Sequence, residues 1–474
     1  MNEGEFRIHS LFNINENRFS INEKDLKVFN FDDYWIVTNR LTNGWIILTL
    51  EEVNSLFQPN LIASNNANYS INLTNLYKYG IIKNNGQYIN NVSTDISENI
   101  IYFELNLTNS CNLHCRYCVS NFNKNTENII MDDATANNFC NKIEQYLIQN
   151  QLSQIVIEFS GGEPILNFNI IKSVIQGLRK HKNIYFVIQS NGTLLTESHL
   201  AFLSKVSNVE IALSLDGINE KHNINRFSKD TFQQVLAILQ RIKKENIKCN
   251  IVTVVSENNI NDLSEIVTTF IQMNLNFSLL PLLPFGKAES NNMNLNIIKF
   301  VNKLWEIDSN ICKKYYDNGE VVLERNIGTV FSYLVQPHRK FMCNRSPCGA
   351  GINIISISPD GKIYPCYGFQ GMNDYLIGNI NSNLSFNDIS QSSVVLNLKN
   401  RIVNNIKDCS DCNYNIWCYG GCASNSVLNY EELLHKDTIH CQFYKQIITK
   451  SLKRVIYNKR DKEYMINTGN KWAR

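Results

Sequence analysis

The sequence predicts an α/β protein whose core is a parallel β-sheet, either open or curved into a partial barrel. Three observations lead to this fold class. Between residues 100 and 290, six short apolar runs alternate with longer amphipathic stretches, which is the pattern of repeated β/α units. Polar motifs in this region fall directly after predicted strands, where ligands collect in such folds. Of the 14 cysteines, none lies in residues 1–110 and eight lie between Cys343 and Cys441, which marks off a cysteine-rich C-terminal part.

Residues 1–95 are expected to form a small winged-helix-like module. Short β-like runs occur at 27–31, 35–38 and 44–48, and a capping box of Thr49 and Glu52 opens a short helix through about residue 57. A second helix is predicted near 73–79, with Gly80 as its stop. Winged-helix folds often bind DNA, but residues 1–100 hold 7 basic and 11 acidic side chains, whereas a nucleic-acid footprint should be basic. The sequence therefore argues against nucleic-acid binding.

The sheet region spans residues 100–290. Each apolar run is short enough for a strand, and each intervening stretch is long enough for a crossover helix. The predicted strands are 101–107, 155–160, 184–189, 209–215, 249–255 and 276–283, and the predicted helices lie near 133–149, 168–181, 196–205, 231–245 and 260–273.

The remainder of the chain divides into three parts. Residues 291–340 are a linker with a helical connection at about 295–317. Residues 341–445 are cysteine-rich with weak periodicity, and such a segment can fold around bound metal with little core of its own. Residues 446–474 form a basic tail; from Lys445 to Arg474 there are nine basic and two acidic residues, and we interpret this stretch as a solvated helix or arm.

Charge and hydropathy limit the setting in which the protein works. With 45 basic and 43 acidic residues, the whole molecule is no polyanion binder. The start, MNEGEFRIHS, lacks the charged-then-apolar pattern of a signal peptide, and no apolar run approaches the roughly 18 residues of a membrane span. We expect a cytoplasmic protein without membrane contact. Thiols stay reduced there, and clustered cysteines act as ligands or catalytic groups.

The first cysteine motif is CNLHCRYC, in which Cys111, Cys115 and Cys118 follow the first predicted strand of the sheet region. Three thiolates on one tight loop can hold three irons of a cubane cluster and leave the fourth iron open for a substrate. A structural zinc normally takes four ligands, and no fourth cysteine lies close by. His114 is the alternative fourth ligand, but its place between two cysteines fits an exposed loop residue better.

This motif resembles that of the radical S-adenosylmethionine enzymes, and the resemblance covers roughly residues 100–285. SGGEP at 160–164, QSNG at 189–192 and SLDG at 214–217 each follow a predicted strand and look like family motifs. By this resemblance the glycines allow close backbone approach, Glu163 accepts from the methionyl ammonium, and Ser214 and Arg226 contact the ribose and carboxylate region, with Tyr117 near the adenine. The implied contacts to the cofactor are Tyr117, Gly161, Gly162, Glu163, Ser190, Asn191, Ser214 and Arg226.

Each of these motifs has an ordinary structural explanation when taken alone. The two glycines could be a strand-to-helix turn, Asp216 and Gly217 a β-turn, and Tyr117 a packing residue. Their order along the chain, each at a strand end, favours the family interpretation. The resemblance implies that a reduced cluster cleaves S-adenosylmethionine to a 5′-deoxyadenosyl radical, which abstracts hydrogen from an unactivated C–H bond.

The second cysteine constellation resembles the SPASM domain. The spacing runs C-x12-G-x4-C from Cys348 to Cys366, then C-x2-C-x5-C-x3-C from Cys409 to Cys422, then Cys441, and Cys343 supplies an eighth thiol. Eight thiolates make two four-cysteine clusters, so the resemblance implies three 4Fe–4S clusters in all. Spacing alone would group residues 409–422, and structural zinc is the alternative ligand. The resemblance implies one set of Cys343, Cys348, Cys366 and Cys422 and another of Cys409, Cys412, Cys418 and Cys441, while Cys140, Cys249 and Cys312 are expected to be core or incidental residues.

The resemblance leaves the substrate between two branches of maturases. One branch cross-links ribosomally made precursor peptides through thioether or carbon–carbon bonds, and its N-terminal winged-helix-like element binds the leader, for which strand addition at a sheet edge offers a route. The other oxidises a protein Ser or Cys to formylglycine and carries an aspartate where this chain has Tyr367. We favour the first branch, with a flavodoxin- or ferredoxin-type reductant. The sequence identifies neither the peptide, nor the bond, nor a catalytic base.

Two other classes of protein stay open on the sequence alone. A non-catalytic iron–sulfur electron carrier would have no use for an open-iron triad or for SGGEP. A zinc-dependent binding module with a DNA-binding N-terminus would be colourless, and its DNA binding would be sensitive to salt.

Overall fold

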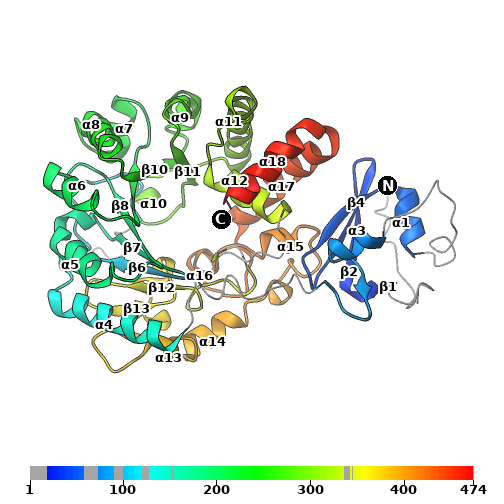
Figure 1. Ribbon diagram of the computed structural model, residues 1–474, viewed down its shortest axis with the longest axis horizontal. Helices are drawn as coiled ribbons and strands as arrows, with labels where there is room; N and C mark the ends of the chain where they lie inside the picture. Colours follow the sequence, from blue (N-terminus) through cyan, green and yellow to red (C-terminus); the bar gives the residue numbers. More distant parts are fainter. Residues whose placement is uncertain are drawn as a thin grey trace.

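A computed structural model describes residues 19–57, 73–89, 100–119, 128–150, 154–335, 342–343 and 345–472. The leading segment MNEGEFRIHS and the expected domain boundaries at about 95 and 340 lie outside these residues. The molecule is elongated, with the sheet and its helices at one end and the N-terminal module at the other (Figure 1). In the part of the chain that is described, no helix is both long and apolar enough to cross a bilayer.

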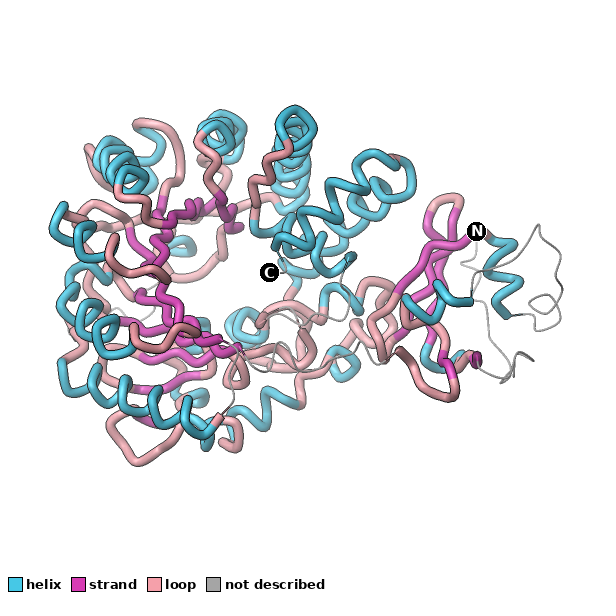
Figure 2. The backbone as a smooth tube through the Cα atoms, viewed as in Figure 1, coloured by secondary structure: helices cyan, strands magenta, loops and turns pink. Residues whose placement is uncertain are grey.

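The centre of the molecule is a nine-stranded sheet in the order β11-β10-β9-β8-β7-β6-β12-β13-β14. The six strands from β6 to β11 run parallel. Because the described sheet ends at β11 on one side and at β14 on the other, it is an open, curved partial barrel, as predicted (Figure 2). The parallel strands are β6 (Ile100–Asn106), β7 (Gln154–Ser160), β8 (Ile184–Ser190), β9 (Val209–Ser214), β10 (Lys248–Val255) and β11 (Asn276–Pro281).

Amphipathic helices cover the outer face of this sheet (Figure 1). The predicted helices are found with ends shifted by a few residues at most, because each has an apolar stripe that packs on the strands. The sequence did not predict α7 (Glu220–Arg226), whose seven residues EKHNINR are almost all polar. The outer helices are α4 (Asp133–Gln149), α5 (Phe168–Leu178), α6 (Glu197–Leu203), α8 (Thr231–Lys244), α9 (Leu263–Gln272) and α11 (Ile297–Asn318).

The cysteine-rich part continues the same sheet. Strand β12 (Ile354–Ile357) pairs parallel with β6, and β13 (Lys362–Tyr364) and β14 (Gly378–Asn379) follow antiparallel. All four residues of β12 are buried, so this part shares the main core. Its helices are α13 (Phe386–Ile389), α14 (Ser393–Lys399), α15 (Asn415–Cys418) and α16 (Ala423–Tyr430), and α10 (Lys287–Ser290) precedes it.

Short 3-10 helices occur along the whole described chain: η1 (Glu23–Asp25), η2 (Pro164–Asn167), η3 (Ile260–Asp262), η4 (Tyr367–Phe369), η5 (Asn373–Tyr375) and η6 (Val403–Asn405).

The basic tail is helical, which is one of the two forms predicted, but it packs against the protein, so the prediction that it is solvated is wrong. It completes α17 (Thr438–Tyr457) and forms α18 (Lys459–Trp472), which packs on α12 (Arg325–Val335). Tyr464 and Met465 are buried there, and a side chain at Gly469 would meet the carbonyl oxygen of Phe331 at 2.8 Å. The many Lys and Arg residues made these helices look fully polar in the sequence, although each has one buried face.

In its described residues, the N-terminal module consists of a three-stranded antiparallel sheet and two short helices. Its strands are β2 (Leu26–Phe31), β3 (Tyr34–Asn39) and β4 (Trp45–Leu48), its helices are α1 (Leu50–Phe57) and α3 (Leu73–Lys78), and β1 (Phe19–Ser20) pairs with β5 (Lys83–Asn84). The capping box is present: Thr49 N donates to Glu52 at 2.7 Å, and Glu52 N donates to the Thr49 hydroxyl at 3.2 Å. The module has a small core of its own.

The module docks on α12 and on the cysteine-rich part through aromatic side chains. The Trp45 indole N–H donates to Leu334 O at 3.0 Å, and its ring meets Trp417 edge-on at 5.8 Å. Phe29 lies 6.5 Å from Tyr414 between ring centroids. Trp417 and Tyr414 belong to the segment between Cys409 and Cys422, so the N-terminal sheet rests directly on one of the cysteine loops.

Candidate active site

The loop that carries Cys111, Cys115 and Cys118 begins where β6 ends, and the SGGEP turn after β7 presses against it. Gly162 N donates to Thr108 O at 2.7 Å, and Glu163 N donates to Ser110 O at 2.9 Å. A Cβ at Gly161 would lie 2.3 Å from Thr108 O, and one at Gly162 would lie 2.1 Å from Ser110 O. Gly161 also has a φ of 126°, which L side chains rarely adopt. The two glycines therefore allow close approach of backbone to the cysteine loop.

Glu163 ties the ends of β7 and β8 together. Its carboxylate accepts from the Ser190 hydroxyl at 2.7 Å, from Asn191 N at 2.8 Å and from Ile165 N at 3.2 Å. Burial raises the pKa of Glu163, and these hydrogen bonds oppose that rise. Three protein donors thus already engage the group that the sequence assigned to the methionyl ammonium, and contact with the ammonium stays a prediction.

Asn191 and Ser214 complete the strand-end polar groups. The Asn191 amide donates to Cys111 Sγ at 3.9 Å and to Asn112 Oδ1 at 3.0 Å. The Ser214 hydroxyl accepts from the Gln189 amide at 3.4 Å. Both residues lie at the carboxyl edge of the sheet, and Asn191 contacts the cysteine loop.

Arg226 and Tyr117 meet on Asp216, a residue that the sequence suggested only as part of a β-turn. The Arg226 Nε donates to Asp216 Oδ2 at 2.6 Å, and the Tyr117 hydroxyl donates to the same oxygen. Burial alone would raise the pKa of Asp216, but the Arg226 guanidinium holds it below its usual range. A carboxylate buried at the end of a central strand needs such a partner, and this requirement is the signal that could have identified the pair.

Burial raises the pKa of the Cys111 thiol to about 11 and also raises that of Cys115. Thiolates at these positions therefore need a compensating positive charge. Bound iron would supply that charge, and the three thiols on one loop fit the donor set of a cluster with one open iron.

The auxiliary cysteines fall into two groups in space. Cys343, Cys366 and Cys422 line one cavity, and Cys348 packs in the same small cluster as Cys366, so these four thiols lie near one another. Cys422 is thus placed away from its sequence neighbours. The other four thiols, Cys409, Cys412, Cys418 and Cys441, together line a cavity of about 100 Å³. Whether iron occupies either group stays a prediction.

Buried Arg401 holds the backbone between the two groups. Its guanidinium donates to the carbonyl oxygens of Gly420, Gly421, Leu433 and His435 and to the Ser426 hydroxyl. Gly420 and Gly421 both have positive φ, which lets the chain turn away from Cys418 and carry Cys422 to the other group.

Among the described residues, no three His, Cys, Asp or Glu side chains converge closely enough to hold one metal ion. For comparison, the sulfurs of cysteines bound to one tetrahedral zinc ion would lie about 3.8 Å from one another, given Zn–S bonds of about 2.3 Å. The described cysteines are therefore not arranged around a single zinc ion.

The three spare cysteines lie elsewhere: Cys312 is buried, and Cys140 and Cys249 are half-buried.

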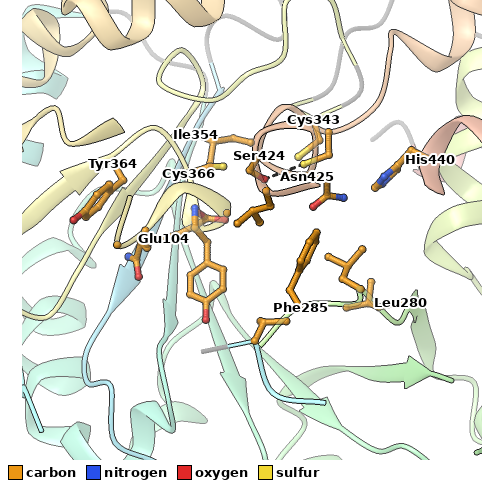
Figure 3. A pocket seen from close by; sticks show the side chains of 18 of the residues that line it. Glu104, Leu280, Phe285, Cys343, Ile354, Tyr364, Cys366, Ser424, Asn425 and His440 are labelled. Atoms are coloured by element: carbon orange, nitrogen blue, oxygen red, sulfur yellow. Dashed lines mark hydrogen bonds between the residues drawn. The ribbon is translucent and has the colours of Figure 1, made fainter. Parts of the chain in front are cut away.

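A cavity of about 570 Å³ lies between the carboxyl edge of the sheet and the auxiliary cysteines (Figure 3). Leu280 and Phe285 line it from the sheet side, and Cys343, Cys366 and Cys422 line it from the C-terminal side. The side chain of Cys343 is exposed to this open cavity. Many protein atoms nevertheless surround its thiol, and this burial raises the pKa of Cys343 to about 12. Asn109 and Val119, which flank the loop of Cys111, Cys115 and Cys118, also line the cavity, so it reaches both cysteine-bearing regions.

Glu104 on β6 is a cavity residue that the sequence analysis missed. It accepts a hydrogen bond from Tyr367 N, and it lies in register with Glu158 on β7, which binds the Tyr102 hydroxyl. Burial and then the neighbouring Glu158 raise the pKa of Glu104 to about 8. Glutamates at inward positions of two central parallel strands are unusual, since such strands are apolar on both faces, and that was the available signal.

Comparison with known proteins identifies the family. The radical SAM superfamily matches residues 105–270, and the SPASM iron–sulfur cluster-binding domain matches residues 348–413. The chain belongs to the radical S-adenosylmethionine (radical SAM) enzymes and carries a C-terminal SPASM domain, as the cysteine spacing predicted.

Three similar proteins illustrate the range of the family. The cysteine-type anaerobic sulfatase-maturating enzyme of Clostridium novyi is 26% identical over 364 residues, which cover 74% of this chain and 94% of that enzyme. The radical SAM cyclopropyl synthase TigE of Paramaledivibacter caminithermalis is 25% identical over 384 residues, which cover 77% and 76%. The structure of Streptococcus suis SuiB, solved with S-adenosylmethionine and with precursor peptide SuiA, shares the fold with a TM-score of 0.55 at 16% identity, covering 88% of this chain and 99% of SuiB.

Proposed function

We propose that this radical SAM enzyme matures a ribosomally made precursor peptide by installing an intramolecular thioether or carbon–carbon cross-link. The observation that carries the proposal is the cavity of about 570 Å³, which borders the strand ends on one side and auxiliary cysteines on the other. A peptide segment in this cavity would lie between the group that removes hydrogen and the groups that accept an electron.

Three 4Fe–4S clusters complete the proposal. Cys111, Cys115 and Cys118 would hold the cluster that binds S-adenosylmethionine, and the two spatial groups of four cysteines would hold the auxiliary clusters. When bound, the cofactor supplies a 5′-deoxyadenosyl radical that abstracts a hydrogen atom. A flavodoxin- or ferredoxin-type protein would supply the reducing electron.

The chain's own residues position the reactants. Ser190 and Asn191 hydrogen-bond to Glu163, and Asn191 also contacts Asn112 of the cysteine loop. Ser214 is held by Gln189 and Arg226 by Asp216, so these polar groups are fixed before a ligand arrives. Apolar side chains such as Leu280 and Phe285 line the cavity and exclude water from a radical intermediate. Glu104 holds a proton there below about pH 8.

The N-terminal module would bind the leader of the precursor. Within the described residues, the sheet order β2-β3-β4 leaves one edge of each outer strand without a paired strand, and an extended leader can add to such an edge. The module contacts the loop between Cys409 and Cys422, so a leader held there would direct the following peptide segment along the C-terminal domain.

Formylglycine formation on a protein Ser or Cys is the second candidate, favoured by the similarity to the C. novyi maturase. Two observations weigh against it. The position after Cys366, where that branch carries an aspartate, is Tyr367, and this residue lines the cavity. The C. novyi enzyme is matched over 94% of its length yet covers only 74% of this chain, so it has no counterpart for a segment as long as the N-terminal module.

The test is anaerobic co-expression with the short peptide encoded next to the gene, followed by mass spectrometry of that peptide. We expect loss of two hydrogens per cross-link, and no loss with a variant in which Cys111, Cys115 and Cys118 are all Ala. Modification of a sulfatase-derived Cys or Ser peptide with no change in the precursor would favour the second candidate. Iron analysis adds a check: about twelve irons at four per cluster, and about eight in the triple variant.

A further inference from the structure

Arg226 makes two directed contacts at once. Its Nε donates to Asp216 Oδ2 at 2.6 Å, and its NH1 lies 3.8 Å from Cys115 Sγ in hydrogen-bonding geometry. The guanidinium carbon lies 5.6 Å from the centroid of the Tyr117 ring. The arginine side chain is 8% exposed, so water does not compete for these contacts. The guanidinium is therefore placed between a carboxylate and a thiol of the cysteine loop.

Asp216 is fixed from several elements, and it fixes Arg226 in turn. The Tyr117 hydroxyl donates to Oδ2, and Val254 N donates to Oδ1 at 3.0 Å. The backbone of Asp216 is held as well, because its N–H donates to His222 Nδ1 at 3.1 Å and its carbonyl accepts from the Asn259 amide at 2.7 Å. The carboxylate of Asp216 is fully buried. With one end anchored in this way, the guanidinium presents NH1 to Cys115 without a further loss of freedom.

The ion pair is oriented with its positive end toward Cys115. The Nε of Arg226 is engaged by Asp216, while its NH1 faces Cys115 Sγ, so the guanidinium lies between the carboxylate and the thiol. An arginine stays charged at every pH of interest, and its field is weakly screened inside a protein. Adding one electron to a cluster bound through Cys115 increases the negative charge next to this cation. Hydrogen bonds to cluster sulfurs raise reduction potential for the same reason.

We propose that Asp216 and Tyr117 hold Arg226 as a hydrogen-bond donor to Cys115, and that this donor raises the reduction potential of the cluster bound by Cys111, Cys115 and Cys118. The inference rests on the part of the proposed function that places a cluster on this loop. It gives Arg226 a role before the cofactor binds, in addition to the contact with the cofactor carboxylate that the sequence predicted.

The test is an anaerobic redox titration of full-length reconstituted protein without S-adenosylmethionine, followed by electron paramagnetic resonance. The signal to follow is the one that the Cys111, Cys115, Cys118 triple Ala variant lacks. In Arg226→Gln we expect the ratio of reduced to oxidised cluster at a fixed potential to fall at least tenfold, equivalent to about 59 mV for one electron. A ratio within twofold of wild type would overturn the proposal.

Two further variants make the result specific. Arg226→Gln leaves a buried carboxylate unpaired and can unfold the site, so the double variant Arg226→Gln, Asp216→Asn removes both charges and should show a smaller fall in the same direction. Arg116→Gln removes a positive charge from the same loop at a residue with no described contact to a cysteine sulfur, and should change the ratio far less. An equal fall in Arg116→Gln would show a general charge effect and contradict the assigned contact.

The titration uses no peptide, so its outcome is separate from the cross-linking assay. An unmodified precursor with the expected potential shift would overturn the peptide-maturase proposal alone. A modified precursor with no shift would overturn only the role of Arg226.

Discussion

Single residues at the strand ends show how closely the site is packed. Gly162 approaches Ser110 so closely that a Cβ there would lie 2.1 Å from the carbonyl oxygen, and Asp216 receives hydrogen bonds from the cysteine loop, α7 and β10. Close backbone contacts and the buried Asp216 carboxylate therefore fix the position of the cysteine loop more than exposed side chains do. Small substitutions at such positions should affect cluster binding without reaching the cavity.

Gly162→Ala tests this point. The added methyl group cannot fit against Ser110 O at 2.1 Å without moving the cysteine loop, so we expect loss of one cluster, seen as a fall from about twelve to about eight irons per chain. Gly177→Ala is the matched control, because the nearest atom to its Cβ is Cys140 Sγ at 3.8 Å and it lies in helix α5, where Ala is favoured. Full iron content in Gly162→Ala would contradict the packing argument.

Glu324, just before α12, predicts a pH dependence of stability. It is buried and accepts from Leu279 N, Ile327 N and the Asn326 amide, and burial raises its pKa from 4.5 to about 7. Because the folded pKa is the higher one, the folded state retains the proton more strongly. Its contribution is fully present below about pH 4.5, and stability falls as the pH rises to about 7, by on the order of 3 kcal/mol.

Thermal melts of Glu324→Gln between pH 5 and 8 check this prediction. The melting temperature of wild type should fall as the pH rises over this range. In Glu324→Gln, the part of this fall that comes from Glu324 should be absent. Exposed Glu51 on α1 provides the control, since Glu51→Gln should follow wild type. Parallel curves for Glu324→Gln and wild type would show that Glu324 does not titrate in this way.

At the scale of elements, the sequence predicts most where periodicity and burial agree. The strands and helices between residues 100 and 290 follow the apolar pattern because each helix packs one stripe on the sheet. The pattern failed in the tail, where Tyr464 and Met465 are buried among many lysines, and it missed α7, which is short and polar. The tail helix is buried because it packs on α12, and α7 contacts the cysteine loop. Both partners are distant in the sequence.

The same limit applies to the site. The motifs located the cysteine loop and its neighbours, because each motif ends a strand. Glu104 and Asp216 could not be assigned from the sequence, since their roles depend on partners distant in the chain, Tyr367 for one and Tyr117 with Arg226 for the other. Spacing alone also could not place Cys422 with Cys343, Cys348 and Cys366.

The N-terminal module makes a prediction at this scale. If its sheet edge holds the leader, deletion of residues 1–95 should weaken binding of the full-length precursor at least tenfold, while cofactor cleavage without peptide continues. Fluorescence anisotropy with labelled precursor measures the first quantity, and release of 5′-deoxyadenosine measures the second. A leaderless core peptide is the control and should bind both proteins equally. Unchanged affinity for the full-length precursor would exclude the recognition role.

In the whole molecule, one continuous sheet connects the radical SAM domain with the SPASM domain. Strand β12 of the SPASM domain pairs with β6, whose loop carries Cys111, so the two cysteine-bearing regions are parts of one rigid core. The cavity lies at their junction, and the N-terminal module rests on the far side of the auxiliary cysteines. This arrangement would suit a reaction in which one hydrogen atom leaves the peptide at one wall of the cavity, an electron leaves at the other wall, and a proton passes to water.

The proposed reaction requires that the peptide itself lose a hydrogen atom to the cofactor-derived radical. Its most direct test is the mass of 5′-deoxyadenosine formed with a precursor peptide that carries deuterium at its carbon-bound positions. We predict that part of the 5′-deoxyadenosine is one mass unit heavier than with unlabelled peptide, in step with cross-link formation. Unlabelled 5′-deoxyadenosine from a fully deuterated peptide that is nonetheless cross-linked would contradict the account.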